Sequence, residues 1–222
     1  CVHNGDKWLK ECIESILNQS YSKFEFLIID DGSKDKSLSI IKKYALKDSR
    51  IIFVSQSNIG LTASLNKGLL MAKGEWIARI DCDDLACKER LEKQIAYAKK
   101  LNLDLVGCQS YLINSKGRFE SFLPIPIGYK KLRANLNSQK NFFKHSSVLF
   151  KKKSVLKLGG YREVMKKSQD YDLWLRISEI GRIGCIDYVG VYIREHLYNI
   201  SFIEKGNEQR LFAHCANISH IL

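Results

Sequence analysis

The sequence predicts an α/β protein in which a mostly parallel, Rossmann-like sheet is flanked by helices. Three observations predict it: short apolar runs typical of buried strands, amphipathic stretches between them, and acidic residues directly after two of the runs. Because strands and helices alternate, they form βαβ units, whose strands run parallel. The 222 residues are enough for one domain of this kind with a full core.

The first half of the chain carries the regular alternation. Apolar residues recur at helical spacing from Trp8 to Leu17, which predicts a helix over about residues 6–19. The continuous apolar run at residues 24–29 is typical of a buried strand. The two patterns then repeat and predict strands at 51–54, 76–80 and 104–111, with helices at about 36–46, 58–72 and 88–101.

The second half is less regular, and we expect a mixed region there. Residues 111–122 have the pattern of a hairpin around a turn at 114–117. Trp174 shares a helical face with Ile177, so it is expected in the core. Further predicted elements are helices at 129–136, 152–158 and 170–180, a strand at 146–150, and one or two strands at 183–194. No linker separates the halves, so residues 1–222 are expected to form a single domain.

The formal net charge of +12 favours an anionic partner. The lysines are spread along the chain, so a solvated basic surface is the simplest explanation. Peripheral contact with an acidic membrane surface ranks second. A nucleic-acid partner is not expected, because the sequence has no basic stripe with interleaved aromatic residues.

The cysteine pattern and the hydropathy of the sequence indicate in which cellular compartment the protein is expected. The seven cysteines are scattered without a CxxC pair, which favours reduced thiols in the cytoplasm over a disulfide framework or a zinc site. No run approaches the ~18 apolar residues of a membrane span. The chain begins at Cys1 rather than at Met, and we expect it to be a fragment at both ends.

Asp81, Cys82, Asp83 and Asp84 directly follow a predicted strand. Three carboxylates in four residues repel one another unless something compensates them. Mg²⁺ or Mn²⁺ bound by the carboxylate oxygens would do so and could also bridge to a diphosphate. The alternative is a solvated acidic turn that caps the next helix. Ligands of parallel α/β sheets lie beyond the carboxyl ends of the strands, which favours the metal site.

Asp30, Asp31, Gly32 and Ser33 follow another predicted strand. A carboxylate at such a strand end can accept hydrogen bonds from a nucleobase or from a ribose hydroxyl. Gly32 permits a tight backbone turn. Taken alone, the segment is explained as well by an Asp-Gly turn followed by a serine N-cap.

Together these segments resemble family 2 inverting glycosyltransferases with the GT-A fold. The shared motifs occur in the family's order over residues 3 to about 201: His3-Asn4-Gly5, Ser15 to Ser20, Ile28 to Ser33, Asn58-Ile59-Gly60, Lys73-Gly74-Glu75, Asp81 to Asp84, Gly159-Gly160-Tyr161, and Asp170 to Arg176. The family normally begins with a strand that leads into a Pro-Val-Tyr-Asn-like segment. Here Cys1-Val2-His3-Asn4 stands in that place without the strand, which favours the truncation.

The resemblance implies a nucleotide-sugar donor, with a family-level preference for UDP, and Mn²⁺ or Mg²⁺ as cofactor. Asp31, with its neighbour Asp30, matches the carboxylate that reads the nucleobase. Asp81 and Asp83 match the DXD pair, in which Asp81 lies near the ribose and the metal and Asp83 ligates the metal. Arg79 could face the diphosphate or the base, and an ordinary strand-end arginine is an equal alternative.

The resemblance also implies a catalytic base and an additional metal ligand. Asp170 matches the base that takes the proton of the acceptor hydroxyl, although it could equally cap the helix that follows. Gln169 stands where the family usually has Glu, which puts acceptor positioning in question. His196 lies in a segment whose His can complete the metal shell, and a structural or surface role is the alternative. His145 is a weaker candidate for the acceptor site.

We therefore expect residues 1–111 to bind the donor and residues 112–222 to face a saccharide or lipid-linked acceptor. The expected location is the cytoplasm, including the inner face of the membrane. One alternative is a nucleotidyltransferase, but residues 1–10 lack the Gly-rich basic loop that it would need. Another is a non-catalytic domain that keeps the fold, which Gln169 and the missing strand would favour. A dehydrogenase is disfavoured because no GxGxxG occurs.

Overall fold

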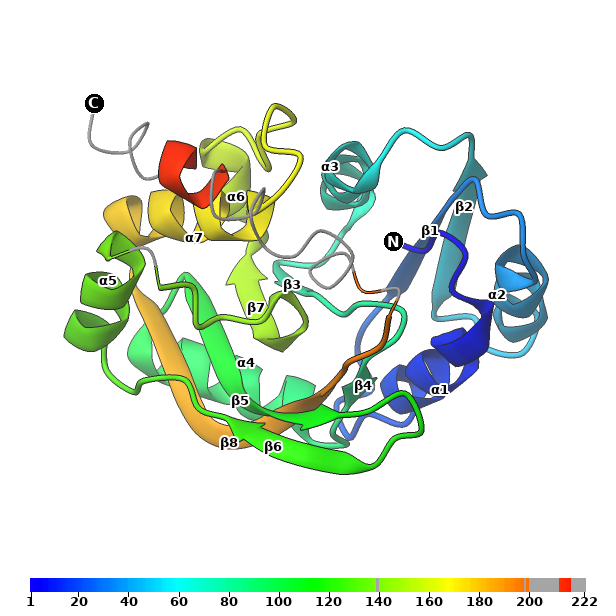
Figure 1. Ribbon diagram of the computed structural model, residues 1–222, viewed down its shortest axis with the longest axis horizontal. Coiled ribbons are helices and arrows are strands. Elements are labelled where there is room, and N and C mark those ends of the chain that lie inside the picture. The colour runs from blue at the N-terminus through cyan, green and yellow to red at the C-terminus, as the bar shows by residue number, and fades with distance from the viewer. Residues whose placement is uncertain (139, 198, 200–211, 217–222) are drawn as a thin grey trace.

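The computed structural model describes residues 1–138, 140–197, 199 and 212–216, and it has an α/β architecture (Figure 1). The predicted α/β class is confirmed. The elements follow in the order α1 (Asp6–Leu17), β1 (Phe26–Asp31), α2 (Ser37–Ala45), β2 (Ile51–Gln56), α3 (Leu61–Met71), β3 (Trp76–Ala78), β4 (Leu85–Ala86), α4 (Arg90–Leu101), β5 (Leu105–Ile113), β6 (Phe119–Leu123), α5 (Tyr129–Asn137), η1 (His145–Ser147), β7 (Val148–Lys151), α6 (Lys152–Lys157), α7 (Gln169–Ile180) and β8 (Ile183–Arg194).

β1 and β2 form a parallel pair, as the alternating pattern of the first half predicts. The pair lies between α2 on one side and α3 on the other (Figure 1). Ile28 and Ile29 of β1 are buried, and the strand ends in the buried carboxylates of Asp30 and Asp31. The chain entering α1 runs beside the end of β1, where Val2 forms a parallel bridge with Asp30. The start of the chain is thus held against the first acidic segment.

The larger sheet has the order β3-β7-β5-β8-β4, and β6 pairs with β5 outside this path. β5 and β8 are parallel, whereas β7 is antiparallel to both β3 and β5, and β4 is antiparallel to β8. The expectation of a mostly parallel sheet therefore holds for some pairs only. The strands that make the sheet mixed are β6 and β7, which belong to the half predicted to be irregular, and the two-residue β4.

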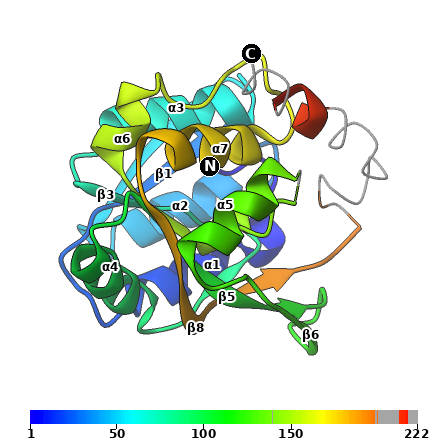
Figure 2. The same cartoon turned by 90° about the vertical axis from the view of Figure 1, so that its left-hand side faces the viewer.

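Two of the three apolar clusters in the described residues join α7 and α1 to the sheets. The larger surrounds α7, where Leu173, Trp174 and Ile177 are fully buried against residues of β5, β7 and β8. The smaller joins α1 to β1 and α2 through residues such as Leu9, Ile13 and Ile28. α4 packs on β5 and β8, and the view in Figure 2 shows α5 on the opposite side of β8. Trp174 lies in the core, as the sequence predicts.

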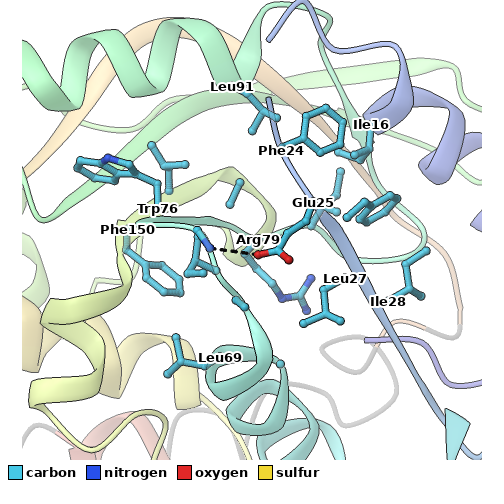
Figure 3. A pocket seen from close by; sticks show the side chains of 18 of the residues that line it. Ile16, Phe24, Glu25, Leu27, Ile28, Leu69, Trp76, Arg79, Leu91 and Phe150 are labelled. Atoms are coloured by element: carbon cyan, nitrogen blue, oxygen red, sulfur yellow. Dashed lines mark hydrogen bonds between the residues drawn. The ribbon is translucent and has the colours of Figure 1, made fainter. Parts of the chain in front are cut away.

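β1 and β3 do not pair with each other, and an apolar cavity of about 350 Å³ separates them. Its walls come from β1, α3, β3 and α4, and Leu27, Trp76 and Phe150 are among the side chains that line it (Figure 3). The guanidinium of Arg79 also lies in this cavity (Figure 3). The carboxyl ends of β1 and β3, which carry the two acidic segments, thus lie on either side of one gap.

Candidate functional site

The acidic turn, defined here as residues 81–84, connects β3 to β4. It does not cap a helix, because β4 intervenes and α4 begins only at Arg90, with Glu89 as its N-cap. The turn packs instead against α1, where the thiol of Cys12 donates to the carbonyl oxygen of Asp81 at 3.2 Å. The helix-cap alternative for this segment is therefore wrong.

Asp83 and His196 meet in the structure. Nε2 of His196 lies 2.9 Å from Oδ2 of Asp83, and Nδ2 of Asn199 lies 3.3 Å from the same oxygen. The side chain of Asp83 is one-fifth exposed and that of His196 is 7% exposed, so both lie largely out of solvent. The imidazole ring stacks on Trp8 with ring centroids 4.0 Å apart, which fixes its orientation. The pair offers one carboxylate and one imidazole to a ligand.

Ser146 joins the two other carboxylates of the turn. Its Oγ lies 3.0 Å from Oδ2 of Asp81 and 2.5 Å from Oδ2 of Asp84, and it accepts a bond from the backbone N–H of Asp81. The other oxygen of Asp81 accepts a bond from Arg79 at 2.5 Å. Arg79 is thus an ion-pair partner of Asp81, and its Nε and Nη1 are buried without a hydrogen-bond partner in the described part of the chain.

The three carboxylates titrate differently. Burial and the neighbouring charge of Asp81 raise the pKa of Asp83. Burial raises the pKa of Asp84 well above its ordinary value, with Asp81 and Asp83 adding to the effect. Burial also opposes ionisation of Asp81, but the charge of Arg79 together with the other favourable contacts, including the hydrogen bonds from Arg79 and Ser146, outweighs it, and the pKa of Asp81 is lowered. Burial and mutual repulsion thus disfavour the ionised forms of Asp83 and Asp84, and a bound divalent cation would favour them.

The donor set fits Mg²⁺ or Mn²⁺ in part. Carboxylate oxygens suit either ion, and a neutral imidazole suits Mn²⁺. Among the described residues no three His, Cys, Asp or Glu side chains converge as a complete metal cage. A cation held by Asp83 and His196 would therefore take its remaining ligands from water and from a bound diphosphate.

Asp30 and Asp31 have distinct environments. Asp30 is turned inward, where its two oxygens accept bonds from Ser55 Oγ at 2.8 Å and from the Ser33 N–H at 3.3 Å. Asp31 accepts bonds from Gln56 Nε2 at 2.8 Å and from the N–H groups of Ile59 and Gly60 at 3.0 and 2.9 Å. Burial raises the pKa of Asp31, but these hydrogen bonds outweigh it and leave the pKa lowered. Asp31 is thus an ionised carboxylate that fixes the loop before α3.

Ser33, in the loop between β1 and α2, does not cap a helix either. α2 begins at Ser37 with Lys36 as N-cap, whereas the Oγ of Ser33 accepts a bond from the N–H of Asn4. At Gly32, where φ is +73°, a Cβ atom would lie 2.7 Å from the backbone nitrogen of Asn58, so only glycine fits. His3 completes the group, because its Nδ1 lies 2.9 Å from the Asp31 carbonyl oxygen and 3.1 Å from Asn58 Nδ2.

Asp170 lies in the first turn of α7. The helix begins at Gln169 with Ser168 as N-cap, so Asp170 is not the N-cap residue. Its Oδ2 accepts a bond from Asn141 Nδ2 at 3.1 Å. Burial raises the pKa of Asp170, and the charge of Asp81 acts in the same direction, whereas bonds from Tyr171 and Asn141 oppose the change. Asp170 and the acidic turn therefore share one electrostatic environment.

His145 and Tyr161 lie between these groups. Nε2 of His145 is 3.0 Å from the hydroxyl of Tyr161. Burial and then Arg79 lower the pKa of His145 well below its ordinary value, so its imidazole is neutral. Burial raises the pKa of Tyr161, with Arg79, Asp170 and Asp81 among its charged neighbours.

Several site residues have no signal in the sequence. Ser146, Asn141 and Asn199 are isolated polar residues whose partners are 29 to 116 positions away. Arg194 ends β8 and donates to the carbonyl oxygen of Asp83 at 2.9 Å. Its neighbour His196 draws attention as a metal-ligand type, whereas a strand-end arginine does not.

The chain matches known proteins in sequence. Residues 1–159 match the model of the family described as glycosyl transferase family 2. The O-antigen biosynthesis glycosyltransferase WbnJ of Escherichia coli is 39% identical over 98% of this chain and 84% of its own length. The uncharacterized glycosyltransferase MJ1057 of Methanocaldococcus jannaschii is 36% identical over 97% of this chain and 75% of its own length.

Solved structures match the fold. Staphylococcus aureus TarS, residues 1–349 in complex with UDP, superposes with a TM-score of 0.75 at 19% identity and covers all of this chain. The mannosyltransferase PcManGT of Pyrobaculum calidifontis, in complex with GDP-Man and Mn²⁺, has a TM-score of 0.68 at 18% identity and covers 99% of it. This chain spans 63% and 60% of those two chains. At such identities the likeness shows the GT-A fold alone.

Proposed function

Because the chain belongs to glycosyl transferase family 2 and is a glycosyltransferase, we propose that it transfers a sugar from a UDP-sugar to a saccharide or lipid-linked acceptor with inversion of the anomeric carbon. The observation that carries the proposal is the meeting of Asp83 and His196 at 2.9 Å, in a buried site where the charge of Asp81 also acts on Asp83. Burying a carboxylate and an imidazole costs free energy and adds nothing to an apolar core. The same two groups are suitable ligands for the metal of a metal–diphosphate complex.

Asp83 and His196 would hold Mn²⁺ or Mg²⁺, and Asp81 would lie near the ribose and the water ligands of the metal. When bound, the cation supplies positive charge that stabilises the departing diphosphate. The ion pair to Arg79 at 2.5 Å keeps Asp81 ionised and oriented. Arg79 then acts on the donor through Asp81, and its two unpartnered nitrogens give it remaining donor capacity toward a phosphate.

Asp170 would act as the base of a single in-line displacement. Its carboxylate takes the proton of the acceptor hydroxyl, and the hydroxyl oxygen forms the new bond to the anomeric carbon. The bond from that carbon to the diphosphate oxygen breaks, and the nucleoside diphosphate leaves with the electron pair. The bond from Asn141 orients the Asp170 carboxylate, and burial raises its pKa toward a value that suits a base.

The nucleoside would lie beside the loops at the end of β1. Asp31 is held there by the N–H groups of Ile59 and Gly60. Asp30 accepts a bond from the N–H of Ser33 in the loop that follows β1. The likeness to TarS structures in complex with UDP and with UDP-GlcNAc supports a uridine donor. The mannosyltransferase in complex with GDP-Man shows that this fold also takes a guanine nucleotide, so the donor screen includes both bases.

We assign donor binding to residues 1–111 and acceptor binding to residues 112–222. Asp170 comes from the second part, and the charge of Asp81 in the first part acts on its pKa, which supports a reaction at the junction of the two parts. The described residues contain no helix long and apolar enough to cross a membrane. A lipid-linked acceptor would bring the protein to the inner face of the membrane, where its charge of +12 favours peripheral contact with anionic lipids. The name of the WbnJ relative supports a role in cell-envelope polysaccharide synthesis.

A donor screen by thermal shift tests this function. UDP with MnCl₂ is expected to raise the melting temperature more than either alone, and more than GDP with MnCl₂. The screen is repeated with UDP-sugars, and the sugar that stabilises the protein is then tested for hydrolysis or transfer. No shift with any nucleotide and metal combination would contradict the proposal. Stabilisation without transfer to any acceptor tested would support the non-catalytic alternative that Gln169 raises.

A further inference from the structure

We propose that Arg194 is a positioning residue that holds Asp83 and His196 in register for the metal. The inference rests on the proposed function and adds to it a residue that touches neither the donor nor the cation. Arg194 is the last residue of β8, and its side chain is 2% exposed. Its contacts connect three parts of the fold at the site: α1, the acidic turn and the end of β8.

Arg194 is attached to the acidic turn at two points. Its Nε donates to the carbonyl oxygen of Asp83 at 2.9 Å, and its backbone N–H donates to Oδ1 of Asp84 at 2.8 Å. The first bond fixes the backbone of the proposed metal ligand itself. The second fixes the carboxylate of Asp84, whose other oxygen accepts a bond from Ser146. Arg194 therefore helps to fix the conformation of the acidic turn, in addition to the hydrogen bonds that Asp81 and Asp84 make with Ser146.

Helix α1 holds the guanidinium from the other side. Nη2 of Arg194 donates to Glu11 Oε2 at 2.7 Å, and the guanidinium lies 5.8 Å from the centroid of the Trp8 ring. Glu11 is 56% exposed, so it provides a charge partner at the surface for a cation that is itself buried. A lysine could not replace this arrangement, because one ammonium lacks the fork that reaches both Asp83 and Glu11.

The same contacts fix His196. It lies two residues after Arg194, and its ring stacks on Trp8, the residue beside which the guanidinium also lies. Movement of Arg194 would thus displace Asp83 through its carbonyl oxygen and His196 through the chain. Partners that orient metal ligands in this way typically contribute about 10- to 100-fold to metal affinity or activity.

The test measures Mn²⁺ affinity directly, from the EPR signal of free Mn²⁺ in the presence of saturating UDP. Arg194→Lys is expected to weaken Mn²⁺ binding about 10-fold or more, with turnover recovering at high MnCl₂ because Asp83 and His196 remain. Glu11→Gln, a milder change at an exposed residue, is expected to weaken Mn²⁺ binding by up to about 5-fold. Each variant is first compared with the wild type by circular dichroism and melting temperature.

Arg50→Lys is the matched control. Arg50 also joins a carboxylate to a carbonyl oxygen, through Asp48 at 2.7 Å and Leu17 at 2.9 Å, and these partners lie outside the acidic turn. The Mn²⁺ affinity of the Arg50→Lys variant is expected to equal that of the wild type. Unchanged Mn²⁺ affinity in both Arg194→Lys and Glu11→Gln would overturn the positioning role alone. Absence of Mn²⁺ binding by the wild type would overturn the proposed function and, with it, this inference.

Discussion

The imidazole of His196 lies 2.9 Å from the carboxylate of Asp83, although 113 positions separate the two residues. They come from distant parts of the chain, one following β3 and the other following β8. Trp8 of α1 stacks on the imidazole and so fixes its plane. A histidine held against a carboxylate in this way is oriented for a shared ligand.

Asp170→Asn is expected to lose transfer and keep nucleotide binding. The amide cannot take the acceptor proton, so kcat should fall about 10²- to 10⁴-fold while the affinity for UDP with Mn²⁺ stays within about 2-fold. Stopped assays with the identified donor give kcat, and thermal shift gives the affinity. Glu179→Gln, an exposed change on the same helix, is the control. Turnover in Asp170→Asn equal to that of the wild type would reassign the base.

The pH dependence of transfer should reflect the raised pKa of Asp170. The base acts in its ionised form, so activity is present above the raised pKa and is lost as the pH falls through it. The acidic limb of kcat/KM should therefore lie above the ordinary aspartate value of about 3.9. Asn141→Ala removes a hydrogen bond that lowers this pKa, so it should move the limb further upward. A limb that Asn141→Ala leaves in place would count against Asp170 as the titrating group.

Asp31→Asn should destabilise the fold. The carboxylate accepts the N–H groups of Ile59 and Gly60, and an amide nitrogen facing one of them would leave it unsatisfied, at a cost of about 1–3 kcal/mol at pH 7. Because the folded-state pKa is lowered, this stability is present above the unfolded value of about 3.9 and is lost as the pH falls toward the folded value. Urea unfolding at pH 7 and at a pH near the lowered folded-state pKa measures this stability. Equal stability of variant and wild type at pH 7 would show that Asp31 does not fix the loop.

Trp174 is predicted to act through packing alone. It is fully buried, and its Nε1 has no hydrogen-bond partner in the described chain, so Trp174→Phe loses volume but no polar contact. Trp174→Ala should cost about 3–5 kcal/mol of unfolding free energy, and Trp174→Phe clearly less. Denaturant unfolding gives both values. Weakened UDP affinity in a fully folded Trp174→Phe would instead indicate contact with the donor.

Local patterns were enough to predict the helices and most strands, because burial of α1, β1 and α7 leaves a clear periodicity in the sequence. β4 escaped prediction since its two residues, Leu85 and Ala86, are too few to show a period. The mixed order of the larger sheet depends on β7 pairing between β3 and β5, a long-range choice that no local pattern encodes.

The site was predictable where residue type itself suggests chemistry. The carboxylates of the acidic turn follow a strand, and resemblance to the family singled out Asp170 and His196. Ser146 and Arg194 were missed because their roles depend on partners 62 to 183 positions away. The helix-cap alternatives for the acidic turn and for Ser33 failed because α4 begins at Arg90 and α2 at Ser37, too far along the chain for these residues to be the N-caps.

The most direct measurement is a Mn²⁺ titration followed by EPR, with and without UDP, for the wild type, Asp83→Ala and His196→Ala. Asp187→Ala, at an exposed carboxylate on β8, is the control. UDP is expected to tighten Mn²⁺ binding in the wild type and in the control. Asp83→Ala should abolish this binding, and His196→Ala should weaken it about 10-fold or more. Wild-type Mn²⁺ affinity in a folded Asp83→Ala protein would contradict a metal site at Asp83.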